Sequence, residues 1–116
     1  MAEANCLFCR LVAGDIPATI VRETERTVAF HDIDPQAPVH VLVIPRDHHA
    51  DVAALAGADP GLLSEVVSEA VAVAADEGLV ETGYRIVTNV GRDANQTVPH
   101  LHLHVLGGRR MAWPPG

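Results

Sequence analysis

The chain has 116 residues, of which 48% are apolar, and we expect a single domain spanning residues 1–116 around one hydrophobic core. Aromatic residues make up only 3%, and the formal net charge is −7. This acidity argues against nucleic-acid partners, because non-specific binding to nucleic acids depends on Lys and Arg that neutralise phosphates.

The location of the protein is predicted from two missing signals. The chain does not open with a basic stretch followed by an apolar run, as a signal peptide does. No segment approaches the ~18 apolar residues of a membrane span. We therefore expect a cytoplasmic protein without a membrane partner, where the pair Cys6 and Cys9 indicates metal or redox chemistry rather than a disulfide.

The N-terminal half predicts one short helix and three strands. Residues 6–13 are typical of a helix, which the Gly-Asp-Ile-Pro run after it ends. Strands are expected at residues 20–22 and 27–31, on either side of a polar turn. Residues 39–44 are the most β-prone run of the chain, and Pro45 ends it.

The C-terminal half predicts one long helix and two more strands. Asp59 is placed to cap this helix, Pro60 suits its first position and Gly78 its end. Its apolar residues recur at helical spacing: Leu62, Leu63, Val66, Val67, Ala70, Val73 and Ala74. Strands at residues 84–89 and 100–104 flank a polar loop. The order of elements predicts an α+β fold with a mainly antiparallel sheet, one long helix and one short N-terminal helix.

Three histidines occupy alternate positions in the last strand: His100, His102 and His104. Alternate side chains of a strand point to opposite faces, so the imidazoles share one face while the intervening apolar side chains share the other. Two kinds of chemistry fit such a row. One imidazole attacks phosphorus while its neighbours assist, or two or three of them bind a catalytic metal ion. Spacing alone does not separate these hypotheses.

A polar loop leads into the histidine strand. Asn89, Gln96 and Thr97 offer amide and hydroxyl donors, which can hold phosphoryl oxygens without a metal ion. Each of them alone is typical of an ordinary polar turn. Their position directly before the histidines favours the phosphate interpretation.

Cys6 and Cys9 form half of a metal site. A closed zinc site needs four ligands, and His48 and His100 are available to complete it. The alternative is a pair of thiols without a metal. The remaining histidines are expected at the surface or in structural roles: His31, His40 and His49.

Asp32 lies in a proline-containing loop after Phe30. A carboxylate at such a point can accept both hydroxyls of a ribose. An aspartate that merely forms the turn explains the same position.

These motifs together resemble the Hint branch of the histidine triad (HIT) family, the purine nucleoside phosphoramidase-like proteins. The likeness covers nearly the whole chain. It includes the alternating run at 100–106, the Phe-His-Asp-Ile run from Phe30, Asn89 with Gln96-Thr97, the Gly-Gly-Arg at 107–109 and the final Trp-Pro-Pro-Gly. In place of the glycines usual before the matching Gln, this chain has Ala94 and Asn95, and Pro99 stands where an aromatic residue is common.

The resemblance implies a homodimer that hydrolyses purine nucleoside 5′-phosphoramidates and related adenylates to AMP or GMP, with no cofactor in the chemistry. His102 would form a covalent nucleotidyl intermediate, with its ring oriented by the carbonyl of His100. Asp32 would bind the ribose. The phosphate would be held by His104, Asn89, Gln96 and Thr97. The base pocket would be lined by Leu7, Phe8, Leu11, Ile16, Phe30 and Ile33.

The resemblance also strengthens the metal hypothesis, because members with the cysteine pair use it with histidines that match His48 and His100 to bind structural zinc. Two other functions remain open. One is a metal-dependent hydrolase that uses the three histidines as ligands. The other is a nucleotide-binding or interaction module without catalysis.

Overall fold

One antiparallel sheet of five strands, in the order β1-β2-β3-β5-β4, forms the centre of the molecule. The computed structural model describes residues 3–116, so the first two residues of the predicted domain lie outside it. The strands are β1 (Ile20–Glu23), β2 (Thr27–His31), β3 (Val39–Pro45), β4 (Tyr84–Val87) and β5 (Leu103–Gly107). The helices are α1 (Leu7–Val12), α2 (Val52–Ala58) and α3 (Pro60–Asp76). The predicted α+β class is confirmed.

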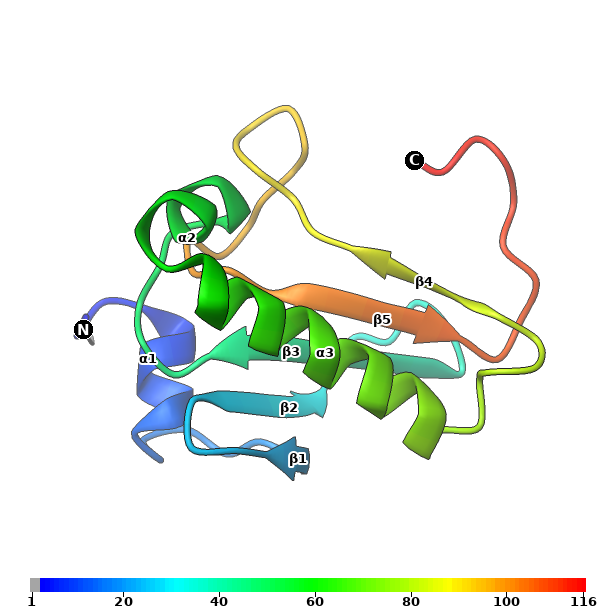
Figure 1. The fold of residues 1–116 in the computed structure, drawn as a ribbon, viewed down its shortest axis with the longest axis horizontal. Helices are drawn as coiled ribbons and strands as arrows, with labels where there is room; N and C mark the ends of the chain where they lie inside the picture. Colours follow the sequence, from blue (N-terminus) through cyan, green and yellow to red (C-terminus); the bar gives the residue numbers. More distant parts are fainter. Residues whose placement is uncertain (1–2) are drawn as a thin grey trace.

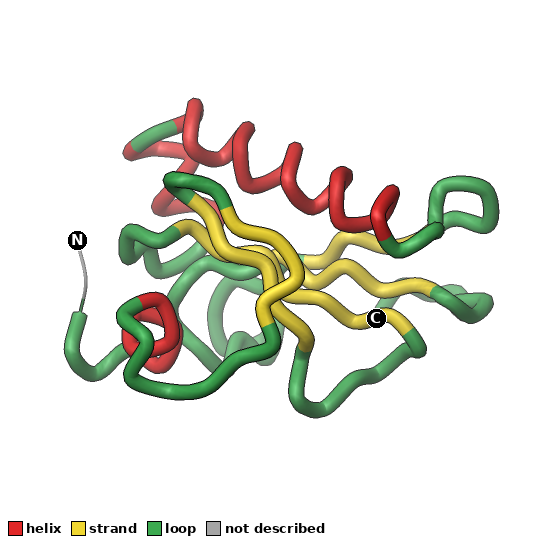
Figure 2. The backbone as a smooth tube through the Cα atoms, turned by 90° about the horizontal axis from the view of Figure 1, so that it is seen from below, coloured by secondary structure: helices red, strands yellow, loops and turns green. Residues whose placement is uncertain are grey.

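The sheet is covered on both faces. Helix α3 crosses one face, next to α2, and the short α1 lies against the other (Figures 1 and 2). Because β3 is central, its side chains are buried alternately on the two sides: Val41 and Val43 toward α3, Leu42 and Ile44 toward α1. Two separate clusters of buried side chains result, which we call the α3-side core and the α1-side core.

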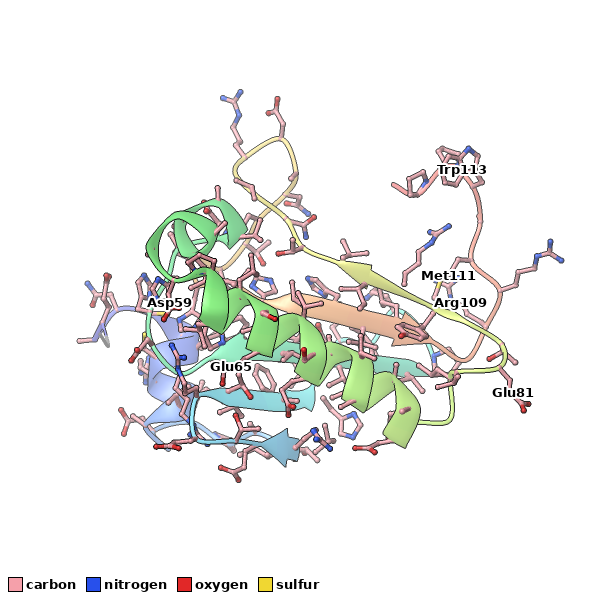
Figure 3. All side chains as sticks on the ribbon, viewed as in Figure 1. Asp59, Glu65, Glu81, Arg109, Met111 and Trp113 are labelled. Carbon is pink, nitrogen blue, oxygen red and sulfur yellow. The ribbon has the colours of Figure 1, made fainter. Side chains whose placement is uncertain are left out.

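Helix α3 begins as predicted. The carboxylate of Asp59 accepts a hydrogen bond from the backbone N–H of Leu62 at 3.0 Å, and Pro60 takes the first turn. Most of the predicted stripe is buried, but Val67 is 41% exposed, so its assignment to the core was wrong. Arg26, in the turn between β1 and β2, pairs with Asp59 at 2.6 Å and Glu65 at 2.7 Å and ties that turn to the helix (Figure 3).

Helix α2 was missed by the sequence analysis. It has seven residues, and Leu55 is its one fully buried side chain, so no helical periodicity could develop. The available signal was Asp51, whose carboxylate caps the helix by accepting the N–H of Ala54 at 2.8 Å. In the part of the chain that the structure describes, no helix has both the length and the apolar character needed to cross a membrane.

The last strand begins later than predicted. We expected a strand over residues 100–104, whereas β5 begins at Leu103. The preceding backbone makes its hydrogen bonds elsewhere, because Leu101 N–H donates to the carbonyl of His49 at 2.7 Å and His100 N–H donates to that of Val98 at 2.9 Å. His100 therefore lies in a bend and His102 in the irregular segment that leads into β5.

Candidate active site and metal centre

The predicted alternation of histidines and apolar residues is confirmed although the strand is shorter. Leu101, Leu103 and Val105 belong to the α3-side core. The imidazoles of His100, His102 and His104 face the other side of the sheet. Each of the three has different neighbours, so they cannot be treated as equivalent.

The ring of His102 is held in one orientation. Its Nδ1 donates a hydrogen bond to the carbonyl of His100 at 2.8 Å, which places the proton on Nδ1 and leaves the lone pair of Nε2 available. Phe8 packs against the ring edge to face, with centroids 5.1 Å apart. Thr88, directly after β4, donates its hydroxyl to the carbonyl of His102 at 3.0 Å and fixes the backbone there. Both the side chain and the main chain of His102 are thus positioned.

His104 is linked to His40 on the neighbouring strand β3, two positions from Leu42, the residue directly opposite His104. The backbone N–H of Gln36 donates to His40 Nδ1 at 3.0 Å, so the proton of a neutral His40 is on Nε2. That Nε2 lies 2.9 Å from His104 Nδ1 and 3.4 Å from a carboxylate oxygen of Asp32. When His40 donates to His104 Nδ1, a neutral His104 carries its own proton on Nε2. His102 and His104 then differ in kind: one offers a lone pair and the other an N–H.

Burial favours the neutral forms of the His104 and His40 imidazoles. Desolvation, assisted by the nearby imidazoles of His102 and His40, lowers the pKa of His104 to about 4. Burial also lowers the pKa of His40, against the opposing influence of Asp32 and Asp34. The neutral forms that the hydrogen bonds require therefore predominate at neutral pH.

A cavity of about 310 Å³ opens beside His102 and His104. This is the lower end of the size range for small-molecule sites. Its wall is mainly apolar and contains Leu7, Phe8, Leu11, Ile16, Pro17, Ala18, Phe30, His31, Asp32, Ile33, Leu42, Thr97, Val98, His102 and His104. All six residues expected around a base are in this wall, as are Asp32 and Thr97. Asn89 and Gln96 are not in it.

The side chain of Gln96 shapes the loop at the edge of this cavity. Its amide nitrogen donates to the carbonyls of Ala50 at 2.7 Å and Val98 at 3.1 Å, and its oxygen accepts the N–H of Gly91 at 2.9 Å. Both amide hydrogens are thereby used within the protein. Asn95 next to it has a φ of 59°, a left-handed conformation that Asn tolerates better than most residues and that explains why glycine suits this place.

The four predicted metal ligands lie together. Cys6 Sγ is 3.3 Å from His100 Nδ1, and Cys9 Sγ is 3.4 Å from His48 Nδ1 and 3.6 Å from His100 Nδ1. All four ligand atoms are within 4.8 Å of one another. Tetrahedral zinc with ordinary Zn–S and Zn–N bonds separates sulfur from nitrogen by roughly 3.5 Å. The Cys6–Cys9–His48–His100 set, here called the Cys/His cluster, fits such an ion without rearrangement.

The surroundings of the cluster fit a metal ion too. His100 donates its Nε2 proton to the carbonyl of Pro45 at 2.9 Å, which leaves the Nδ1 lone pair facing the cysteines. Burial lowers the pKa of His100 to about 4, so the ring is in the neutral form that ligates metals. Burial raises the pKa of the Cys9 thiol, so a cation is needed to hold it as a thiolate. His48 Nε2 lies 3.5 Å from the Glu3 carboxylate.

The sequence analysis did not predict two residues that contact the histidines of the site, His40 and Thr88. His40, expected at the surface or in a structural role, is only 5% exposed and touches His104. The available signal was its position as the one polar residue in the apolar run of residues 39–44. Thr88 carried no signal. Of the other two histidines in that group, His31 is exposed and lines the cavity, and His49 contributes its carbonyl to Leu101.

Comparison with known proteins agrees with this geometry. The family model for the HIT domain matches residues 13–111. The chain belongs to the HIT family. A HIT-like protein of Synechococcus elongatus is 47% identical over 112 residues, which cover 97% of each chain. A 14 kDa zinc-binding protein of Zea mays is 44% identical over 116 residues, covering 98% of this chain and 90% of the maize protein.

A solved structure shares the fold of this HIT protein closely. The crystal structure of a HIT family hydrolase from Legionella pneumophila superposes with a TM-score of 0.93 at 50% sequence identity, over 97% of this chain and all of the other. The fold that positions the alternating histidines in this chain is thus shared with a solved HIT family structure.

Proposed function

We propose that this HIT protein is a hydrolase of the Hint branch that cleaves purine nucleoside 5′-phosphoramidates and related adenylates. The observation that carries the proposal is the pairing of His102 and His104 at an apolar cavity, one with a free Nε2 lone pair and the other with an Nε2 proton. The hydrolase name of the Legionella relative supports the same class of reaction.

The cavity suits a nucleotide part by part. Its apolar wall can enclose a purine ring, since such rings bind largely by desolvation and stacking. Asp32, at one side of the cavity, keeps carboxylate lone pairs for the ribose hydroxyls after accepting the N–H of Asp34 at 2.8 Å. We assign the phosphate to the imidazoles with Thr97 and Asn89, and we assign Gln96 to shaping the loop because its amide hydrogens are used.

The chemistry divides between the two imidazoles. His102 Nε2 attacks phosphorus and a P–N bond to the ring forms, while the bond from phosphorus to the leaving amine breaks. The Nδ1–H bond to the His100 carbonyl stabilises the positive charge that the ring acquires. The leaving nitrogen takes a proton from His104 or from water. An anionic phosphoryl group raises the pKa of His104 and so favours its protonated form for this role. Water then attacks phosphorus, releases His102 and yields the nucleoside monophosphate.

The test is turnover of an adenosine phosphoramidate by the wild type and by His102→Ala. We expect kcat/KM to fall by about 10⁴-fold or more, as removal of a covalent nucleophile does. His49→Ala is the matched control, because its side chain is in neither the cavity wall nor the cluster, and it should stay within a few-fold of the wild type. Acid-labile nucleotidyl-histidine should be trapped on the wild type alone.

Two rival functions predict different results. An active His102→Ala protein would exclude the covalent mechanism, and tight AMP binding without turnover by the wild type would identify a binding module. Catalytic metal on the three histidines is disfavoured by their surroundings. Among the described residues, His100 groups with Cys6, Cys9 and His48, while His104 groups with Asp32 and His40.

We also propose that the Cys/His cluster binds structural zinc. Three observations support this: sulfur-to-nitrogen distances close to those around tetrahedral zinc, the unprotonated Nδ1 of His100, and the zinc-binding name of the maize relative. The ion would supply cross-linking and would not contact the substrate. One zinc per chain, lost from Cys6→Ala, is the expected result of elemental analysis.

We further propose a homodimer. Within residues 3–116, no strand pairs with the outer edge of β4. Apolar side chains are exposed on β4 and on α3: Ile86 at 38%, Val67 at 41% and Val71 at 47%. Trp113, on the C-terminal tail, is 82% exposed (Figure 3). Analytical ultracentrifugation of the whole chain measures the mass directly.

A further inference from the structure

We propose that the Cys/His cluster is a positioning device for the nucleotide site: metal bound there sets the orientation of His102 and the wall of the cavity that α1 forms. This inference rests on the proposed function. It goes beyond a structural role for zinc, because it makes nucleotide affinity and the state of the nucleophile depend on occupancy of a site that touches no substrate.

His100 connects the two sites through a single residue. Its Nδ1 faces Cys6 Sγ at 3.3 Å, and its Nε2 donates to the carbonyl of Pro45 at 2.9 Å. Its own carbonyl accepts the Nδ1 proton of His102 at 2.8 Å. The side chain of His100 is completely buried. Because the ring is buried and held at both nitrogens, we infer that a shift of the ring toward or away from the cysteines is passed on to the carbonyl that orients His102.

Helix α1 connects the sites a second time. Cys6 caps this helix and Cys9 lies within it, and Phe8 between them contacts His102 and lines the cavity. Leu7 and Leu11 of the same helix also line the cavity. A helix of six residues is too short to be stable by itself. The position of this wall thus depends on what holds the two cysteines.

The cluster joins three separate segments of the chain. His48 follows β3, His100 precedes β5, and the cysteines belong to the α1 segment. Without a cation the cysteines face the imidazoles through S–H to nitrogen contacts of 3.3 to 3.6 Å, which are weak hydrogen bonds, and the rings of His48 and His100 pack edge to face with centroids 5.2 Å apart. With zinc they become four strong bonds to one centre. Metal occupancy therefore changes how firmly α1 is fixed.

The experiment compares metal-free, zinc-loaded and reloaded wild type with Cys9→Ala. Val66→Ala is the matched control, because Val66 is fully buried in the α3-side core and its truncation destabilises the fold without touching the cluster. All proteins are studied well below their unfolding midpoints. The readouts are zinc stoichiometry, the Kd for AMP, and the His102 tautomer from long-range ¹H–¹⁵N NMR correlations at one pH.

We expect loaded wild type and loaded Val66→Ala to show a single Nδ1–H tautomer of His102 and equal AMP affinity. Metal-free wild type and Cys9→Ala should show mixed tautomers and AMP binding weaker by about tenfold, which corresponds to ~1.4 kcal/mol. Adding zinc should restore the wild type and leave Cys9→Ala unchanged. If Cys9→Ala fails to fold, the comparison of metal-free and reloaded wild type decides.

Three results overturn the proposal. These are a wild type that takes up no metal, a metal-free wild type with unchanged tautomer and affinity, and a Val66→Ala control that loses affinity as Cys9→Ala does. Failure of the proposed function looks different, since loaded wild type would then bind AMP without turnover, or not bind it at all. In both of those cases the tautomer comparison still tests the positioning.

Discussion

The two faces of the sheet have opposite chemistry. The buried side chains of the α3-side core are all aliphatic, and they come from α2, α3, three strands and the segments that hold Leu79 and Leu101. The opposite face contains cysteines, two phenylalanines and the buried imidazoles of His40, His100 and His102. The first arrangement is typical of a core that provides stability. On the second face, burial also lowers the pKa of His40 and His100 and so favours their neutral forms.

The same strands supply both faces. In β3, His40 and Leu42 face α1 while Val41 and Val43 face α3, and in β5 His104 is followed by Val105 in the α3-side core. Because the period of a strand is two, each reactive side chain has a stabilising neighbour in the chain. Stability and chemistry are therefore divided between the two faces of the sheet, although not between segments of the chain.

The largest effect on stability should come from the α3 face. Leu62 is 1% exposed, so Leu62→Ala should lower the free energy of unfolding by about 2 to 5 kcal/mol, from lost burial and the cavity left behind. Urea denaturation measures this change. The Kd for AMP, measured where the variant is folded, should equal that of the wild type. Weakened AMP binding in the folded variant would show that the faces are not separable.

A smaller effect is expected from the α1 face, and there it should reduce AMP affinity more than stability. Phe8→Leu keeps an apolar side chain but removes the ring that contacts Phe30 at 5.5 Å and His102 at 5.1 Å between centroids. Such aromatic contacts contribute roughly 0.5 to 1.5 kcal/mol each. We expect AMP affinity measured by calorimetry to fall about tenfold. Unchanged affinity beside a large loss of stability would make Phe8 an ordinary core residue.

The smallest effect should be a pH dependence that arises from His104. Its pKa is lowered to about 4 in the folded protein, against an ordinary value of 6.5. Between about pH 6.5 and 4, His104 therefore binds a proton in the unfolded chain but not in the native protein. The free energy of unfolding consequently falls as pH decreases from about 6.5 toward 4. His104→Asn should flatten this fall in metal-free protein, as measured by urea denaturation at several pH values. Identical pH profiles would contradict it.

Local sequence patterns were sufficient for most elements and for the cluster residues. Asp59 with Pro60 predicted the start of α3, and the cysteine pair predicted two members of the Cys/His cluster. They failed for α2, where one buried leucine makes no period, and for the start of β5, where hydrogen bonds to the His49 and Val98 carbonyls replace the sheet. They also placed Val67 in the core, although it lies on the exposed side of the helix.

The sequence alone determined which side chains this HIT protein has: alternating histidines, the two cysteines and two histidines of the Cys/His cluster, and a β-prone central strand. Only the tertiary structure decided which partner each histidine has. His40 meets His104 across 64 positions, and the backbone of Gln36 selects its tautomer. Those contacts depend on strand register and on loop conformation, which arise from packing of the whole chain and leave no local pattern.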